Sequence, residues 1–182
     1  MKSIILFFIL FFLYIGNTYS QSPLEAEFVK QLNVYRKQHG LGPIKYDAEI
    51  SKVALYHANY LSKCNKTSYV VALDKLPHDE KFDIKDHKEL NFTQRASMAP
   101  NKNMWSEIQI AYSPIKNIAT VSEIVSIMIK SFDGSPKHKE IMLCEDLKDF
   151  TNIIGVSIVK AEANNTEYSN YSINVDFGVL IP

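Results

Sequence analysis

The stretch 32–62, LNVYRKQHGLGPIKYDAEISKVALYHANYLS, contains the end of one predicted helix and most of a second. The first helix is predicted over 23–38 and stops before Gly40. Its buried face is predicted to carry Phe28, Leu32 and Tyr35. Asp47 is suited to cap the second helix, because its short side chain can accept from exposed N–H groups. The buried face of the second helix is predicted to carry Ile50, Val53, Ala54, His57 and Leu61. Since the connection is short, both helices are expected to pack against the same core.

Upstream of these helices, residues 1–20 have the pattern of a secretory signal peptide. Lys2 precedes an unbroken apolar run over 4–15, and the small Ser20 lies at the usual cleavage position. We therefore expect a secreted, extracellular protein with one domain over 21–182. No other stretch has membrane-spanning length, so an integral membrane protein is not expected.

The charge of the chain gives no reason to expect nucleic acid as a partner. The sequence contains 20 basic and 20 acidic side chains. Loss of Lys2 with the signal leaves one more acidic than basic side chain. Neither nucleic acid nor an anionic membrane is favoured as the main partner by such a balance.

Downstream of the helical pair, the pattern alternates between helices and strands. Residues 120–123, Thr-Val-Ser-Glu, form a capping box ahead of an apolar run, and that helix is expected to end near Gly134. Ser135 and Pro136 then predict a new helix start, which places His138 in its first turn. Strands are predicted over 105–111, 152–160 and 170–180, the last two as an antiparallel hairpin. This order predicts an α+β domain whose helices cover a sheet.

Three segments resemble the CAP superfamily of cysteine-rich secretory proteins, antigen 5 proteins and plant pathogenesis-related proteins. The stretch 32–62 resembles its first two helices at the following positions: Asn33, Arg36, His39, Gly40, Leu41, Pro43, Tyr46, Asp47 and Ala54–Ala58. SPKHKEIML (135–143) with IIGVSIV (153–159), and the final VDFGV (175–179), are similar to the shorter, bacterial-type members. The resemblance covers about 26–180. It implies a three-layer α-β-α sandwich, in a single domain, with a surface cleft.

The resemblance also implies a divalent-metal site in that cleft. His138 matches the second histidine of the family, Glu107 matches its first glutamate, and His78 is the candidate for its first histidine. Two imidazoles and one carboxylate suit an open zinc site that could activate water for hydrolysis. His138 and Glu107 could instead be surface residues that bind no metal. His87 lies in the same predicted loop as His78 and could replace it as the first histidine.

The sequence departs from the family at this site. Ser106 and Ile108 replace the glycine and asparagine that flank the glutamate, and Lys139 replaces an aromatic residue. The helix before His138 has no glutamate where longer members carry a second one. By contrast, His57 is expected to be a hydrogen-bonded core histidine, and Glu123 to serve its capping box.

Secretion also determines how the two cysteines and the sequons are interpreted. Cys64 and Cys144 are expected to form a disulfide, the alternative being two buried thiols. Four Asn-x-Ser/Thr sequons predict glycosylation in exposed loops, at Asn65, Asn91, Asn164 and Asn170.

Together with the signal peptide and the sequons, the CAP resemblance implies a secreted, monomeric glycoprotein that acts by binding. Its partner would be a lipid or sterol, or another extracellular protein, in an effector-like role. The alternative is a metal-assisted hydrolase that uses His78, Glu107 and His138 with a zinc ion. A third hypothesis is an interaction protein whose cleft has no function. No Ser-His-Asp or His-Glu-x-x-His signature supports an enzyme.

Overall fold

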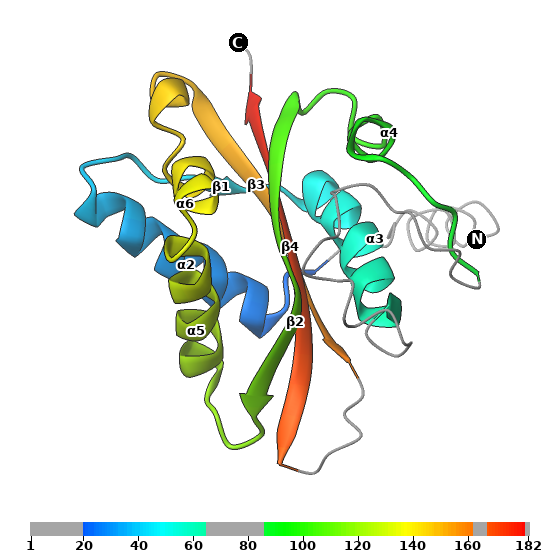
Figure 1. Cartoon of the computed structure of the whole chain (residues 1–182). Helices are drawn as coiled ribbons and strands as arrows, with labels where there is room; N and C mark the ends of the chain where they lie inside the picture. Colours follow the sequence, from blue (N-terminus) through cyan, green and yellow to red (C-terminus); the bar gives the residue numbers. More distant parts are fainter. Residues whose placement is uncertain (1–19, 65–85, 162–166, 181–182) are drawn as a thin grey trace, which may run out of the picture.

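A computed structural model describes residues 20–64, 86–161 and 167–180. They form three layers, with a sheet between two sets of helices (Figure 1). One face of the sheet is covered by α2 (Pro23–Gln38), α5 (Val121–Asp133) and α6 (Pro136–Leu143). The other face is covered by α3 (Ala48–Cys64) and the short α4 (Phe92–Ala96). The predicted α-β-α sandwich is therefore confirmed.

Within the described residues, the sheet has four strands in the order β1-β3-β4-β2. Their bounds are Lys45–Tyr46 for β1, Met104–Lys116 for β2, Thr151–Ala161 for β3 and Tyr168–Leu180 for β4. β3 and β4 form the predicted antiparallel hairpin, β2 pairs antiparallel with β4, and β1 pairs parallel with β3. A 3-10 turn, η2 (Glu145–Leu147), connects α6 towards β3.

The expectation that α2 and α3 share one core is wrong. The two helices lie on opposite faces of the sheet, because β1 joins the sheet edge between them and carries the chain across (Figure 1). Asp47 follows β1 and caps α3 as predicted: its Oδ1 accepts from the N–H groups of Glu49 and Ile50 at 2.9 and 3.1 Å. The short connection therefore places the helices apart rather than together.

The main hydrophobic core lies on the face that α2, α5 and α6 cover. Phe28 of α2 and Phe132 of α5 meet edge to face, with ring centroids 6.3 Å apart. The apolar side of the strands packs beneath them and includes Ile108, Ile154, Val156, Ile173, Val175 and Phe177. Burial of these aliphatic and aromatic side chains is the dominant favourable term in folding.

The opposite face of the sheet is polar, although α3 buries it. Strand alternation places Glu107 and Gln109 of β2, Asn174 and Asp176 of β4, and Ser157 of β3 on this side. His57 of α3 is buried here, and its Nε2 lies 2.5 Å from Gln109 Oε1. The prediction that His57 is a hydrogen-bonded core histidine is thus confirmed.

The backbone of α3 lies directly against the sheet at Gly155. A Cβ placed on this glycine would lie 2.2 Å from the backbone carbon of Ile50 and 2.3 Å from the backbone nitrogen of Ser51. Beside it, the N–H of Val156 donates to Ser51 Oγ at 3.1 Å. The side chain of Ser51 thus satisfies a strand N–H beyond the end of the two-residue β1.

The predicted Cys64–Cys144 disulfide is not formed. Cys64 ends α3 on one face of the sheet, and Cys144 follows α6 on the other (Figure 1). Both side chains are buried, and Cys144 Sγ donates to the carbonyl of Ile141 at 2.7 Å. The sheet between the two helices keeps the thiols too far apart for a bond, since bridged cysteines need Cα atoms within about 7 Å.

Two of the four sequons lie in the described residues. Asn91 is exposed and caps α4, its Oδ1 accepting from the N–H of Gln94 at 2.8 Å. Asn170 is half-buried within β4, between Pro114 of β2 and Ala161 of β3, so its predicted loop position is wrong. Asn65 and Asn164 lie outside the described residues, as does most of the predicted signal peptide. None of the helices described has the length and apolar character needed to cross a membrane.

Candidate functional site

The residues predicted to bind metal are not brought together by the fold. Glu107 points towards α3 and α4, where its Oε1 lies 2.6 Å from Nη2 of Arg95. His138 is on α6, at the other face of the sheet, and its ring meets Phe132 edge to face at 5.4 Å. His78 lies outside the described residues.

Glu107 belongs to a buried polar cluster and is inaccessible to a ligand from solution. Arg95 is fully buried, and its Nη1 donates to the carbonyl of Leu90 at 2.7 Å. Opposite Glu107 in the ladder lies Asp176, to which Asn174 Nδ2 donates at 3.1 Å. Burial, and then the neighbouring Glu107, raise the pKa of Asp176 well above its ordinary value. Asp176 therefore keeps its proton at pH values at which an ordinary aspartate is ionised.

His138 lies at the start of α6 as predicted, although the expected cap is absent. Pro136 occupies the first helical turn, but Ser135 makes no capping hydrogen bond through its side chain. The helix is held instead by Asp133, whose Oδ1 accepts from Tyr35 Oη at 2.6 Å and from Lys139 Nζ at 2.9 Å. The Tyr35 hydrogen bond and then Lys139 lower the pKa of Asp133. This contact ties α2, α5 and α6 together.

The geometry of Glu107 and His138 does not fit a single metal ion. A zinc site needs its ligands to converge on one point, and here the sheet separates the two side chains. Across the described parts of the chain, no group of three His, Cys, Asp or Glu side chains could hold a metal ion. Glu107 is instead a structural partner of Arg95.

A groove of about 680 Å³ lies between α6 with η2 and the start of β2. Its apolar lining includes Trp105, Ile141, Leu143 and Leu147, and its rim includes Lys137, Lys139, Glu140, Glu145 and Asp146. The register of β2 against β4 shifts between Met104 and Ser106, so Trp105 sits at an irregularity in the strand. Trp105 and Ser106 thereby line the groove on the α6 side, while Glu107 faces away.

The wall of the groove is fixed from inside the protein by Arg36. This side chain is buried, and its Nη1 donates to the carbonyls of Met142 and Leu143 at 2.8 and 2.5 Å. Those carbonyls lie in the last turn of α6, where the helix itself supplies no N–H donor for them. This groove was not predicted from the sequence. The sequence feature that pointed to it is Trp105, the single tryptophan of the chain.

Two further apolar side chains are exposed at the end of the sheet where β2 begins. Phe150 precedes β3, and Leu180 ends β4 opposite Thr151. Both side chains are exposed. Large aromatic and aliphatic side chains beside an apolar groove are typical of a binding surface.

Comparison with known proteins agrees with the three-layer fold. The model of the CAP family, the cysteine-rich secretory protein family, matches residues 29–172. The chain therefore belongs to the CAP family, as its sequence resemblance implied.

Two solved structures are similar to this chain. An outer surface protein from Borrelia burgdorferi matches with a TM-score of 0.54 and 18% identity, over 90% of this chain and 98% of that one. An extracellular protein from Bacillus anthracis str. Ames that contains an SCP domain matches with a TM-score of 0.45 and 14% identity. That match covers 81% of this chain and 39% of the other. No curated protein matches the chain in sequence.

Proposed function

We propose that this protein is secreted and acts by binding, with the Trp105 groove as its ligand site. The observation that carries the proposal is the groove itself, about 680 Å³ with an apolar floor and charged residues of both signs at its rim. This volume is in the range of pockets that bind small molecules. An amphipathic ligand of the lipid or sterol class would place its apolar part on Trp105 and its polar part at the rim.

The groove favours binding over catalysis. Burial raises the pKa of the Cys144 thiol, which lines the groove, to about 11, so this thiol is protonated at neutral pH and is a poor nucleophile. Glu107 and His138, two of the three residues of the hydrolase hypothesis, do not meet there, and the third, His78, lies outside the described residues. The charged side chains at the rim are suited to orient a ligand rather than to activate one.

Trp105 makes the proposal directly testable because no other tryptophan contributes to the fluorescence. We expect saturable energy transfer from Trp105 to two fluorescent probes, cis-parinaric acid as a fatty acid and dehydroergosterol as a sterol. Leu147→Glu introduces a charge into the groove and should weaken binding about tenfold, since burial of one aliphatic side chain contributes roughly that much.

A matched control is Val34→Glu, which adds the same charge at an exposed position on α2. It should bind the probes like the unmodified protein. If neither probe gives saturable transfer, the lipid assignment fails, and an extracellular protein becomes the expected partner of the groove. If Leu147→Glu binds the probes as tightly as the unmodified protein, the ligand does not bind in this groove.

A further inference from the structure

The connection between β2 and α5 exposes an isoleucine to solvent. Ile118 is 89% exposed, the highest value among the exposed large apolar side chains of the described residues. Val121 and Ile127 of α5 are also exposed, at 40% and 45%. An apolar side chain at the tip of a connection makes no favourable contact with water, and neighbouring exposed apolar side chains of this size are unusual on a monomer surface.

Ile118 and Ile127 line a second, shallower groove of about 500 Å³ between the end of β2 and α5. Its lining is largely apolar: Pro114, Ile115, Ile118, Ala119, Ile127 and Tyr168. We call Ile118 and Ile127 the Ile118 patch. It is separate from the Trp105 groove, because Trp105 and Lys116 lie near opposite ends of β2. At about 3.3 Å per strand residue, the 11 steps between them span roughly 36 Å when fully extended.

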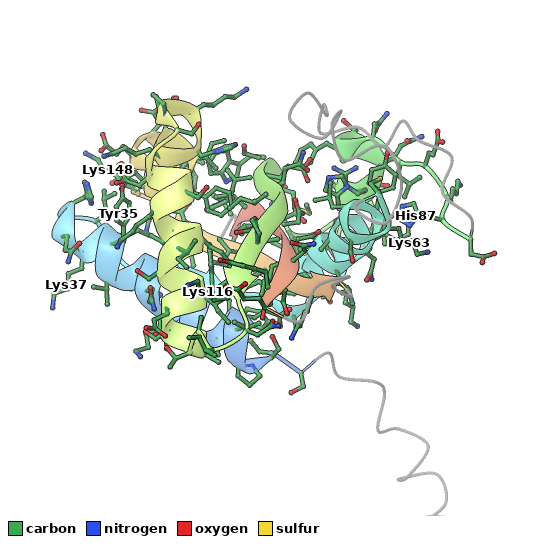
Figure 2. All side chains as sticks on the ribbon, turned by 60° about the horizontal axis from the view of Figure 1, so that its bottom comes forward. Tyr35, Lys37, Lys63, His87, Lys116 and Lys148 are labelled. Carbon is green, nitrogen blue, oxygen red and sulfur yellow. The ribbon has the colours of Figure 1, made fainter. Side chains whose placement is uncertain are left out.

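Lysines flank the patch. Lys116 and Lys130 both line the groove, and neither forms an ion pair with any residue that the structure describes. Glu123 also lines it, but its Oε2 accepts from the N–H and the hydroxyl of Thr120 at 2.7 and 2.8 Å. Figure 2, in which the lower end of Figure 1 comes forward, shows Lys116 at this end of the molecule and Lys148, beside η2, well away from it.

We propose that the Ile118 patch contacts a phospholipid bilayer. A protruding apolar tip enters the interfacial region of a bilayer without a complementary pocket, whereas a protein partner must supply one. Long lysine side chains beside such a tip keep their ammonium groups at the phosphate level and bind anionic headgroups. Glu167 is a second carboxylate at this end, its carbonyl accepting from the N–H of Asn117 at 2.9 Å. Because Glu123 and Glu167 balance the charge of Lys116 and Lys130, insertion of the isoleucines contributes more to bilayer binding than net charge does.

This contact has a consequence for the orientation of the whole protein. With the β2–α5 connection at the bilayer, the Trp105 groove at the other end of β2 faces away from the membrane. The proposal does not depend on the ligand of that groove, and the two are measured separately: Trp105 fluorescence reports the groove, and sedimentation reports the bilayer.

The test is co-sedimentation of the secreted protein with vesicles of phosphatidylcholine and phosphatidylserine. We expect the unmodified protein to sediment with the vesicles and Ile118→Ser to partition about tenfold less. Because Ile118 is almost fully exposed, this change should leave the fold intact, which the melting temperature would confirm. Val34→Ser is the matched control, since Val34 is 53% exposed on a different element and should leave partitioning unchanged.

Three results would overturn the proposal. The first is an unmodified protein that stays in solution when the vesicles sediment. The second is an Ile118→Ser variant that sediments as well as the unmodified protein, and the third is a Val34→Ser variant that loses as much binding as Ile118→Ser. In each case the patch would be assigned to a protein partner or to no partner at all.

Discussion

At the scale of single residues, the buried polar cluster under α3 is the least expected feature of this protein. Arg95 and Glu107 form an ion pair that is nearly inaccessible to solvent, and Asp176 is buried beside it. The hydrogen bonds of this cluster are incomplete within the described residues: Asp176 Oδ1, Asn174 Oδ1 and Ser157 Oγ lack a protein donor. Buried polar groups are costly unless paired, so Asp176 avoids the larger cost of a second buried negative charge by staying protonated.

The raised pKa of Asp176 makes a prediction about pH. Above about pH 4, an ordinary aspartate in the unfolded chain releases its proton while folded Asp176 retains it. The folded state then binds more protons, so the contribution of Asp176 to stability falls as the pH rises towards its raised pKa. Asp176→Asn, which cannot ionise, should remove this loss and make the protein more stable near neutral pH.

The measurement is the free energy of unfolding in urea at about pH 4 and about pH 7. The change in the free energy of unfolding from the acidic to the neutral pH should be more positive in Asp176→Asn than in the unmodified protein. The control is Asp149→Asn, the same substitution at an exposed position away from the buried cluster, which should leave the pH dependence as it is. An Asp176→Asn variant with the original pH dependence would show that Asp176 is ionised in the folded protein.

At the scale of elements, the close contact between α3 and β3 determines how the second helix packs. Only a residue without a Cβ allows the backbone of Ile50 and Ser51 to approach β3 at Gly155. The glycine lies in IIGV, one of the segments through which the sequence resembles the CAP family. The side chain of Asn33 in α2 holds the connection between α2 and β1. It donates to the carbonyl of Ile44 at 3.0 Å and accepts from the N–H of Ile44 at 2.8 Å.

Gly155→Ala should therefore lower the free energy of unfolding by about 3 kcal/mol, since the added methyl group overlaps the α3 backbone. Gly42→Ala is the matched control, because a Cβ at Gly42 meets no heavy atom within 4 Å. Its effect should remain within about 0.5 kcal/mol. Urea denaturation of both variants measures the difference, and equal stabilities would mean that α3 does not pack on β3 this closely.

At the scale of the whole molecule, the sheet divides the protein into two sides with different chemistry. The side covered by α2, α5 and α6 holds the apolar core and the Trp105 groove. The side covered by α3 and α4 holds the polar cluster. This division explains two corrections together, because it separates Glu107 from His138 and Cys64 from Cys144.

A protein whose layers are held without a disulfide should not respond to a reductant. We expect the same melting temperature with and without dithiothreitol, and an intact mass that retains both thiol hydrogens. A disulfide that closes a loop of this length would contribute on the order of 4 kcal/mol, so its reduction would lower the melting temperature by several degrees. Such a drop, with a mass lower by two hydrogens, would contradict the separation of Cys64 and Cys144 by the sheet.

The local elements and the family could be predicted from the sequence. Helix α2, the capping box of Thr120 with Glu123, the terminal hairpin and the burial of His57 follow from periodicity and capping chemistry within a few residues. The CAP resemblance was carried by segments at both ends of the chain, and the match over 29–172 confirms it.

The face of the sheet on which each element lies became known only from the folded structure. A side chain at one position of a strand points to the opposite face from its neighbour, so an irregularity such as that at Trp105 determines whether Trp105, Ser106 or Glu107 meets α6. In the same way, the passage of β1 along the sheet edge sends α2 and α3 to different layers. Sequence spacing carries no information about the face, because the face depends on pairing between segments that are distant in the chain.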